Sequence, residues 1–188
     1  MNSYKNIILV LFIFVVYLCN SQTNTAAYKT WEENFNLGYQ FYNNNQYSEA
    51  EKYFEKALNA SKNAFKQHAE EPISTLYYYA YCKYLRSQFE EALNLFKEIL
   101  LQAQNLSKRD YNFEIKVWGD IASTYSTLGE TIKAITEQNK LNEFIKTSFG
   151  EKSEIYASNS NKLGQMYFAL GDCKTASHYY IVAKNLLI

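Results

Sequence analysis

The strings QYSEA at 46–50, QFEEA at 88–92, ETIKA at 130–134 and DCKTA at 172–176 decide the fold of this chain. Each string ends in an alanine, and each alanine lies 42 residues before the next. Three equal steps without an insertion indicate an internal repeat, and a repeat of this length holds one supersecondary unit. The four alanines are Ala50, Ala92, Ala134 and Ala176.

Two further columns of residues keep the same frame. Twelve residues before the alanines stand Gly38, Ala80, Ala122 and Gly164. Four residues after them stand Phe54, Phe96, Gln138 and Tyr180. Small side chains let two helices approach closely, whereas a larger side chain would push the helices apart. The larger residues fill the space between the layers.

The apolar spacing predicts two helices in each repeat. The first helix of a repeat is expected over residues 30–43, 73–86, 110–127 and 153–169. The second helix is expected over residues 48–64, 89–104, 131–147 and 173–187. Gly129 and Gly171 stand where a helix ends in a left-handed turn, and Asn45 and Ser87 take that place in the first two repeats.

The run Leu37-Gly38-x-x-Phe41…Tyr47-x-x-Ala50-x-x-x-Phe54-x-x-Ala57 resembles the tetratricopeptide repeat signature. The longer repeat is similar to the variety found in kinesin light chains and in many exported bacterial proteins. This resemblance covers residues 31–188 and implies an all-α, right-handed α-solenoid of four helix-turn-helix repeats. The repeats are expected over residues 31–72, 73–114, 115–156 and 157–188. Five residues depart from the family pattern, and we expect looser packing around them, mostly in the third repeat: Asn34, Lys83, Thr131, Gln138 and Ser160.

Composition limits the classes of function and fold. The formal net charge is zero, with 19 basic and 19 acidic residues. A protein that neutralises phosphates needs a basic surplus, so no nucleic-acid partner is expected. Six glycines and a single proline, Pro72, supply too few turns for an all-β fold.

Residues 1–21 have the pattern of a signal peptide. Lys5 precedes an apolar run from Ile7 to Leu18, which is too short to span a bilayer as a helix. We expect cleavage after Ser21, a linker over residues 22–30, and export to the periplasm or beyond the cell with no membrane span remaining. Lipidation of Cys19 or retention of the run as an uncut anchor are the two alternatives.

No arrangement of residues indicates catalysis, a metal site or a cofactor site. His178 is expected on the outer face, and His68 in a loop. Cys82 and Cys173 fall in separate repeats and are expected to be free thiols, with Cys173 at a buried packing position. Glu70-Glu71 and Glu90-Glu91 lie where helices begin, and acidic residues are favourable there. The sequence therefore predicts no catalytic residue and no cofactor.

The family resemblance implies that the first helices of the repeats line a concave groove that binds a partner. Chaperone-binding relatives hold a terminal carboxylate with Lys and Asn at two groove sites, where this chain has Phe35 and Tyr39, so that activity is not implied. Six aromatic residues gather at one end of the groove, and they either contact a partner or only pack between helices. The groove residues are Phe35, Tyr39, Tyr42, Tyr77, Tyr81, Tyr84, Lys116, Asn161, Gln165 and Phe168.

These features together predict a non-enzymatic scaffold that binds a protein or peptide partner in the groove. Two alternatives stay open. The chain could be a sensor or regulatory module of a longer protein of the caspase-like protease or histidine kinase type. It could also bind a small ligand at the aromatic end, where a cavity of roughly 300–1,000 Å³ would favour that function.

Overall fold

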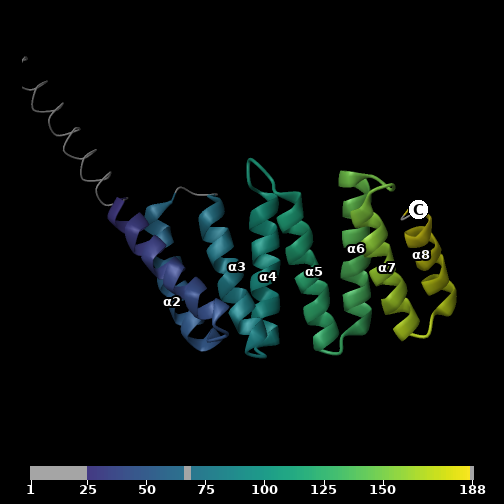
Figure 1. Cartoon of the computed structure of the whole chain (residues 1–188), viewed down its shortest axis with the longest axis horizontal. Helices are drawn as coiled ribbons and strands as arrows, with labels where there is room; N and C mark the ends of the chain where they lie inside the picture. The colour runs from purple at the N-terminus through teal and green to yellow at the C-terminus, as the bar shows by residue number, and fades with distance from the viewer. Residues whose placement is uncertain (1–24, 66–68, 187–188) are drawn as a thin grey trace, which may run out of the picture. The chain divides into compact units, whose positions relative to one another are not determined.

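The computed structural model describes residues 25–65 and 69–186 (Figure 1). The chain divides into two compact units, the first ending at Arg86 and the second beginning at Ser87. All regular elements of the described residues are helices, so the fold is all-α as the sequence predicts. The signal peptide predicted over residues 1–21, and His68, lie outside the described residues.

The first unit holds a helix over residues 25–43, followed by two more helices. These are α2 (Tyr47–Ala64) and α3 (Glu70–Leu85), which pack against each other. Pro72 lies in the first turn of α3, where its missing N–H costs no hydrogen bond. Helix α3 thus begins three residues before the predicted start, at Glu70.

The second unit holds five helices, and each packs against the next (Figure 1). They are α4 (Phe89–Gln104), α5 (Tyr111–Thr127), α6 (Thr131–Phe149), α7 (Glu154–Ala169) and α8 (Cys173–Leu186). Side chains cap three of them. Asp110 accepts from the amides of Asn112 and Phe113 at α5, Ser153 accepts from the amide of Tyr156 at α7, and Asp172 accepts from the amide of Thr175 at α8.

The predicted left-handed turns are confirmed. Gly129 and Gly171 have φ angles of 76° and 88°, and Asn45 and Ser87 have φ angles of 59° and 62°. Glycine adopts this region without strain, and asparagine tolerates it better than most residues. The turns at Asn45, Gly129 and Gly171 therefore reverse the chain between two helices of the same unit.

The predicted columns of small residues lie at the helix contacts. The four alanines of the repeat are at most 1% exposed. A Cβ atom added at Gly38 would lie 2.9 Å from the ring of Phe54, and one at Gly164 would lie 2.7 Å from the ring of Tyr180. These approaches are shorter than van der Waals contact, so only glycine permits the observed packing.

Packing around Lys83 is not loose, in contrast to the prediction. This side chain is only 8% exposed, and its Nζ atom donates to Glu51 Oε1 at 3.1 Å. It also lies 5.1 Å from the centre of the Tyr79 ring. A buried cation is tolerated because a carboxylate on the neighbouring helix balances its charge.

The two cysteines within the described residues, Cys82 and Cys173, are free thiols, as predicted, but one of them is not buried. Cys82 is fully buried, and burial raises the pKa of its thiol to about 12, with the nearby Glu51 carboxylate adding to the shift. Cys173 is exposed, which corrects the predicted buried position. It is the first residue of α8, so its side chain lies at the end of the helix rather than on the packed face.

Candidate functional site

A row of aromatic side chains runs along the helix over residues 25–43. Trp31, Phe35, Tyr39 and Tyr42 are three or four positions apart, so they share one face of the helix. Ring centres are 5.5 Å apart from Trp31 to Phe35, 6.4 Å from Phe35 to Tyr39, and 6.4 Å from Tyr39 to Tyr42. The planes of the last two pairs differ by only 6° and 16°, so these rings stack along the helix.

A second row lies on α3. Tyr77, Tyr81 and Tyr84 follow one another with ring centres 5.8 Å apart in both steps. Their planes differ by 23° and 26°. The two rows belong to the same compact unit, and Tyr42 approaches Tyr81 with a centre-to-centre distance of 6.3 Å.

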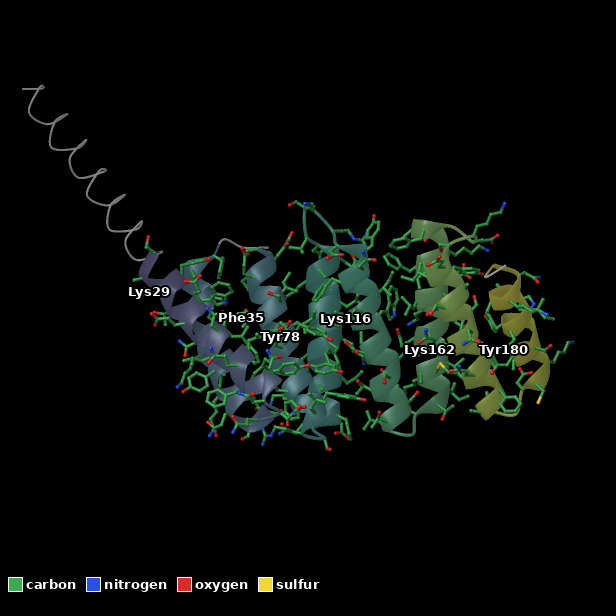
Figure 2. All side chains as sticks on the ribbon, viewed as in Figure 1. Lys29, Phe35, Tyr78, Lys116, Lys162 and Tyr180 are labelled. Atoms are coloured by element: carbon green, nitrogen blue, oxygen red, sulfur yellow. The ribbon has the colours of Figure 1, made fainter. Side chains whose placement is uncertain are left out.

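Tyr78 joins the two rows (Figure 2). Its ring centre lies 5.8 Å from Phe35, 5.4 Å from Tyr39 and 5.6 Å from Tyr42, each in an edge-on arrangement. It also stacks on the buried ring of Phe54 at 5.5 Å. We call the resulting surface the aromatic face, made up of Phe35, Tyr39, Tyr42, Tyr77, Tyr78, Tyr81 and Tyr84.

The rings of the aromatic face differ in exposure. Tyr39 is 41% exposed, whereas Tyr77 is only 4% exposed. The other five rings are partly buried. The same rings therefore pack on one another and leave part of their surface accessible, with Tyr39 the most open of them and Tyr77 offering little to a partner.

Burial changes the acidity of two phenols in this face. Removal from water raises the pKa of Tyr42 to about 12, and the neighbouring Tyr81 adds to the shift. Burial also raises the pKa of Tyr78, and so does its interaction with Tyr39. The two rings are therefore partly withdrawn from water, and the Tyr78 hydroxyl is hydrogen-bonded to Tyr39.

The other four predicted groove residues lie in the second unit and are all exposed. They do not line a single cavity. Lys116 lines a cleft between α5, α6 and α7, whereas Asn161 borders a separate cavity of about 700 Å³ beside α8. Phe168 lines a third cavity, of about 340 Å³, at the α7–α8 pair. Gln165 borders none of these cavities.

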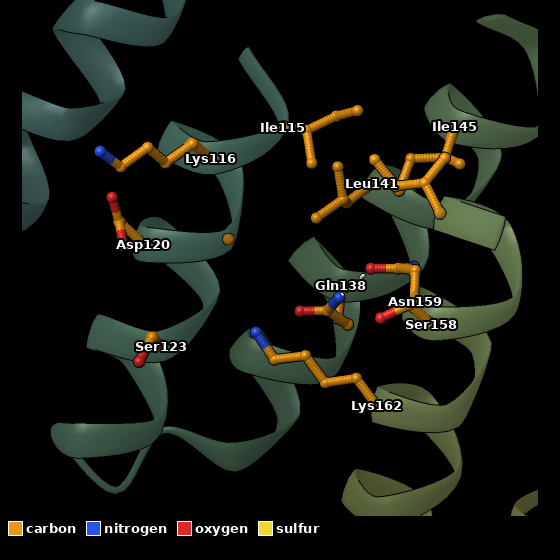
Figure 3. Close-up of a pocket in the computed structure, with 12 residues that line it drawn as sticks. Ile115, Lys116, Asp120, Ser123, Gln138, Leu141, Ile145, Ser158, Asn159 and Lys162 are labelled. Carbon is orange, nitrogen blue, oxygen red and sulfur yellow. Dashed lines mark hydrogen bonds between the residues drawn. The ribbon is translucent and has the colours of Figure 1, made fainter. Parts of the chain in front are cut away.

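The cleft between α5, α6 and α7 has a volume of about 350 Å³ (Figure 3). Its middle is polar because the Gln138 amide donates to Asn159 Oδ1, and the Asn159 amide donates to Asn142 Oδ1 at 2.9 Å. One end is aliphatic. The cleft is lined by Ile115, Lys116, Gly119, Asp120, Ser123, Gln138, Leu141, Ile145, Ile155, Ser158, Asn159 and Lys162.

Residues 31–64 match the family model of the tetratricopeptide repeat. The chain contains a tetratricopeptide repeat. The matched segment covers the second part of the helix over residues 25–43 together with α2, so it is the first of the four repeats. No curated protein resembles the chain at significant sequence similarity.

Solved tetratricopeptide proteins share the fold. The repeats of a protein described as a kinesin light chain from Podospora anserina align with a TM-score of 0.71 and 13% identity, over 84% of this chain and 74% of that chain. The Rap conjugation gene regulator of plasmid pLS20, in complex with the Phr* peptide, aligns with a TM-score of 0.58 and 16% identity. The alignment covers 84% of this chain and 42% of that chain. YrrB, described as having an unusual peptide-binding site, aligns with a TM-score of 0.54 and 15% identity. The alignment covers 79% of this chain and 64% of that chain. At these identities the likeness establishes the fold, an all-α repeat solenoid.

Sequence reasoning missed several residues that shape the aromatic face and the cleft. Tyr78 was assigned no role, although it joins the two aromatic rows. Gln138 was noted only as a departure from the pattern, and its hydrogen bond to Asn159 was not foreseen. The signal for the cleft was present, since a glutamine replaces a ring at this position of the repeat.

The described residues show neither a cluster of metal ligands nor a membrane-spanning helix. Within residues 25–65 and 69–186, no three His, Cys, Asp or Glu side chains gather as metal ligands would. No described helix is both long enough and apolar enough to cross a lipid bilayer. His178 is exposed on α8, as predicted.

Proposed function

We propose that this protein is a non-enzymatic scaffold that binds a peptide or protein partner on its aromatic face. The observation that carries the proposal is Tyr39, which is 41% exposed although neighbouring rings hold it on three sides. A large side chain that is already fixed loses little conformational entropy when a partner covers it. Such aromatic side chains are enriched among the residues that dominate binding energy.

The chemistry of the aromatic face favours an extended polypeptide. Stacked rings offer a long apolar strip, and the protonated hydroxyl of Tyr42 can donate to a backbone carbonyl oxygen. Two proteins of the same fold are described by their peptide complex or their peptide-binding site, which supports a polypeptide partner.

The proposed place of action is outside the bacterial cytoplasm. Support comes from residues 1–21, where a basic residue, a short apolar run and small residues before the cut follow the pattern of a signal peptide. Intact-mass measurement of exported protein should give a chain that starts at Gln22. A mass that retains residues 1–21, or that includes a lipid on Cys19, would contradict this part of the proposal.

Binding can be tested with peptides selected from a random display library on the purified protein. A selected peptide should lose affinity for the Tyr39→Ala variant by roughly tenfold or more, because truncating one interface aromatic commonly costs at least 1–2 kcal/mol. The control is Ile132→Ala on α6, a side chain that is 64% exposed and belongs to the other unit. Equal affinity for Tyr39→Ala and the unchanged protein, with both fully helical by circular dichroism, would refute the proposal.

A further inference from the structure

The hairpin of α7 and α8 carries an open groove along one side. Two cavities, of about 340 Å³ and 700 Å³, adjoin there, because Tyr180 and Lys184 line both of them. The two helices pack side by side (Figure 1), and the groove includes Phe168, which is 63% exposed, and Ile181, which is 56% exposed. Large apolar side chains that gather in an open groove are typical of an interaction site.

Two positions of the repeat have the opposite character on α8 from that on the earlier helices. The position held by Leu93 on α4 and by Ile135 on α6 is buried, and on α8 it holds the exposed Ser177. Four residues later the repeat is polar on α4 and α6 but apolar on α8, where the residues are Lys97, Asn139 and Ile181 in that order. The groove side of α8 therefore suits a neighbour other than a further repeat of the same kind.

The groove side of α8 also has a spacing that is symmetric about its middle. Four residues, separated by four, three and four positions, share one side of the helix: Cys173, Ser177, Tyr180 and Lys184. This spacing is the same from either end, so a second α8 that runs antiparallel would match it residue for residue. Tyr180 would then lie opposite the small Ser177 of the second copy, and Lys184 would lie opposite Cys173. A large residue opposite a small one lets two helices approach closely.

The charges at the two ends of the hairpin fit the same arrangement. Glu154 and Lys184 line one cavity, at the end where α7 begins and α8 ends. Asp172 and Lys174 lie at the other end, where α8 begins, and all four side chains are exposed. An antiparallel copy would bring Lys184 against Asp172, and Glu154 against Lys174. A parallel copy would set each charge against its like, so the charges favour the antiparallel arrangement.

We propose that this groove is the interface of a homodimer, in which the α7–α8 hairpins of two copies pack antiparallel as a four-helix bundle. Two-fold symmetry places the same surface on both copies, so Phe168 and Ile181 of each copy are covered and every ion pair occurs twice. Helix α8 has 14 residues and is about 21 Å long. The contact is therefore short, and we expect a Kd on the order of 10 µM. The interface lies in the second unit and is independent of binding to the aromatic face.

Association can be measured by sedimentation velocity of the purified protein between about 1 µM and 300 µM, a range that brackets the expected Kd. The sedimentation coefficient should rise from that of a monomer to that of a dimer. Ile181→Glu places a charge inside the interface and should raise the Kd at least tenfold. The matched control is Ile132→Glu on α6, where the native side chain is 64% exposed and lies outside the hairpin, and it should leave the Kd unchanged.

Disulfide trapping tests the antiparallel register. Lys184→Cys places a thiol opposite the native Cys173 of the second copy, so oxidised glutathione should convert the two thiols into an intermolecular disulfide. Within one helix these two positions are about 16 Å apart, which is too far for a disulfide. Adding Cys173→Ser should abolish the crosslink, and Asn94→Cys, at an exposed site on α4, should give none.

A charge exchange separates the interface from a structural effect on the hairpin. Glu154→Lys should raise the Kd about tenfold, because it sets two positive charges against each other at both ends of the dimer. Combining it with Lys174→Glu restores opposite charges and should return the Kd to that of the unchanged protein. The proposal is overturned if the protein stays monomeric throughout the concentration range, if Lys184→Cys gives no crosslink or one that survives Cys173→Ser, or if the charge exchange does not restore association.

Discussion

Replacing Gly164 by alanine tests the close approach of α7 and α8. The added Cβ atom would lie 2.7 Å from two ring carbons of Tyr180. Carbon atoms pack at about 3.5–4.0 Å, so the ring must retreat by about 0.8 Å or more. Overpacking of this kind costs roughly 1–3 kcal/mol, and the better helix propensity of alanine returns about 0.5–1 kcal/mol. We expect a net loss of about 1–2 kcal/mol in the free energy of unfolding.

Gly119→Ala is the matched control. Gly119 lies inside α5, and a Cβ atom there would meet nothing within 4 Å. Alanine at this site should therefore stabilise the protein by about 0.5–1 kcal/mol through helix propensity alone. Urea denaturation followed by circular dichroism measures both changes. A Gly164→Ala variant that gains as much stability as Gly119→Ala would refute the packing argument.

Three other perturbations should give defined results. Gly171→Ala forces an L residue into a φ of 88° and should lower the free energy of unfolding by about 1 kcal/mol. Asn45→Gly, at a φ of 59°, should change the free energy of unfolding little, and urea titrations measure both variants. Glu51→Gln removes the carboxylate that pairs with the buried ammonium of Lys83, and denaturation should show a loss of about 3 kcal/mol. An unchanged midpoint would contradict the contribution of this ion pair. The pKa of Tyr42 is raised to about 12 in the folded state, so the unfolded state loses the phenol proton at a lower pH. The free energy of unfolding should therefore fall as pH rises from about 10 to 12. Tyr42→Phe should reduce this fall, as thermal melts at a series of pH values would show.

The sequence predicted the repeat well because its decisive features are local. The alanines recur at equal steps, and their burial follows from helix contacts that every repeat must make. Asn45 and Ser87 were assigned to left-handed turns because they align with Gly129 and Gly171. Residues at the same position of the repeat thus share a backbone conformation even where their side chains differ.

Contacts between helices were harder to predict. Lys83 pairs with Glu51, 32 positions earlier, and no local pattern links the two residues. Tyr78 lies outside the groove sites implied by the family resemblance, so its contacts with Tyr39 and Tyr42 depend on how α3 packs. Cys173 was wrongly predicted to be buried, because alignment alone does not show that the first residue of α8 lies at the end of the packed face.

The candidate sites also depend on contacts between helices. Helical spacing placed Phe35, Tyr39 and Tyr42 on one face, and the structure adds that these rings stack and that Tyr39 stays open. The unpaired oxygen of Gln138 follows from hydrogen bonding between α6 and α7, which the sequence does not encode in any regular spacing.

The central claim is that a polypeptide partner lies on the aromatic face. Photo-crosslinking tests it most directly, with benzoylphenylalanine placed at position 39 in one variant and at position 132 in another. A peptide selected on the unchanged protein should crosslink at position 39, where the native tyrosine is 41% exposed, and not at position 132, where the native isoleucine is 64% exposed. Crosslinking at position 132 without crosslinking at position 39 would contradict the account.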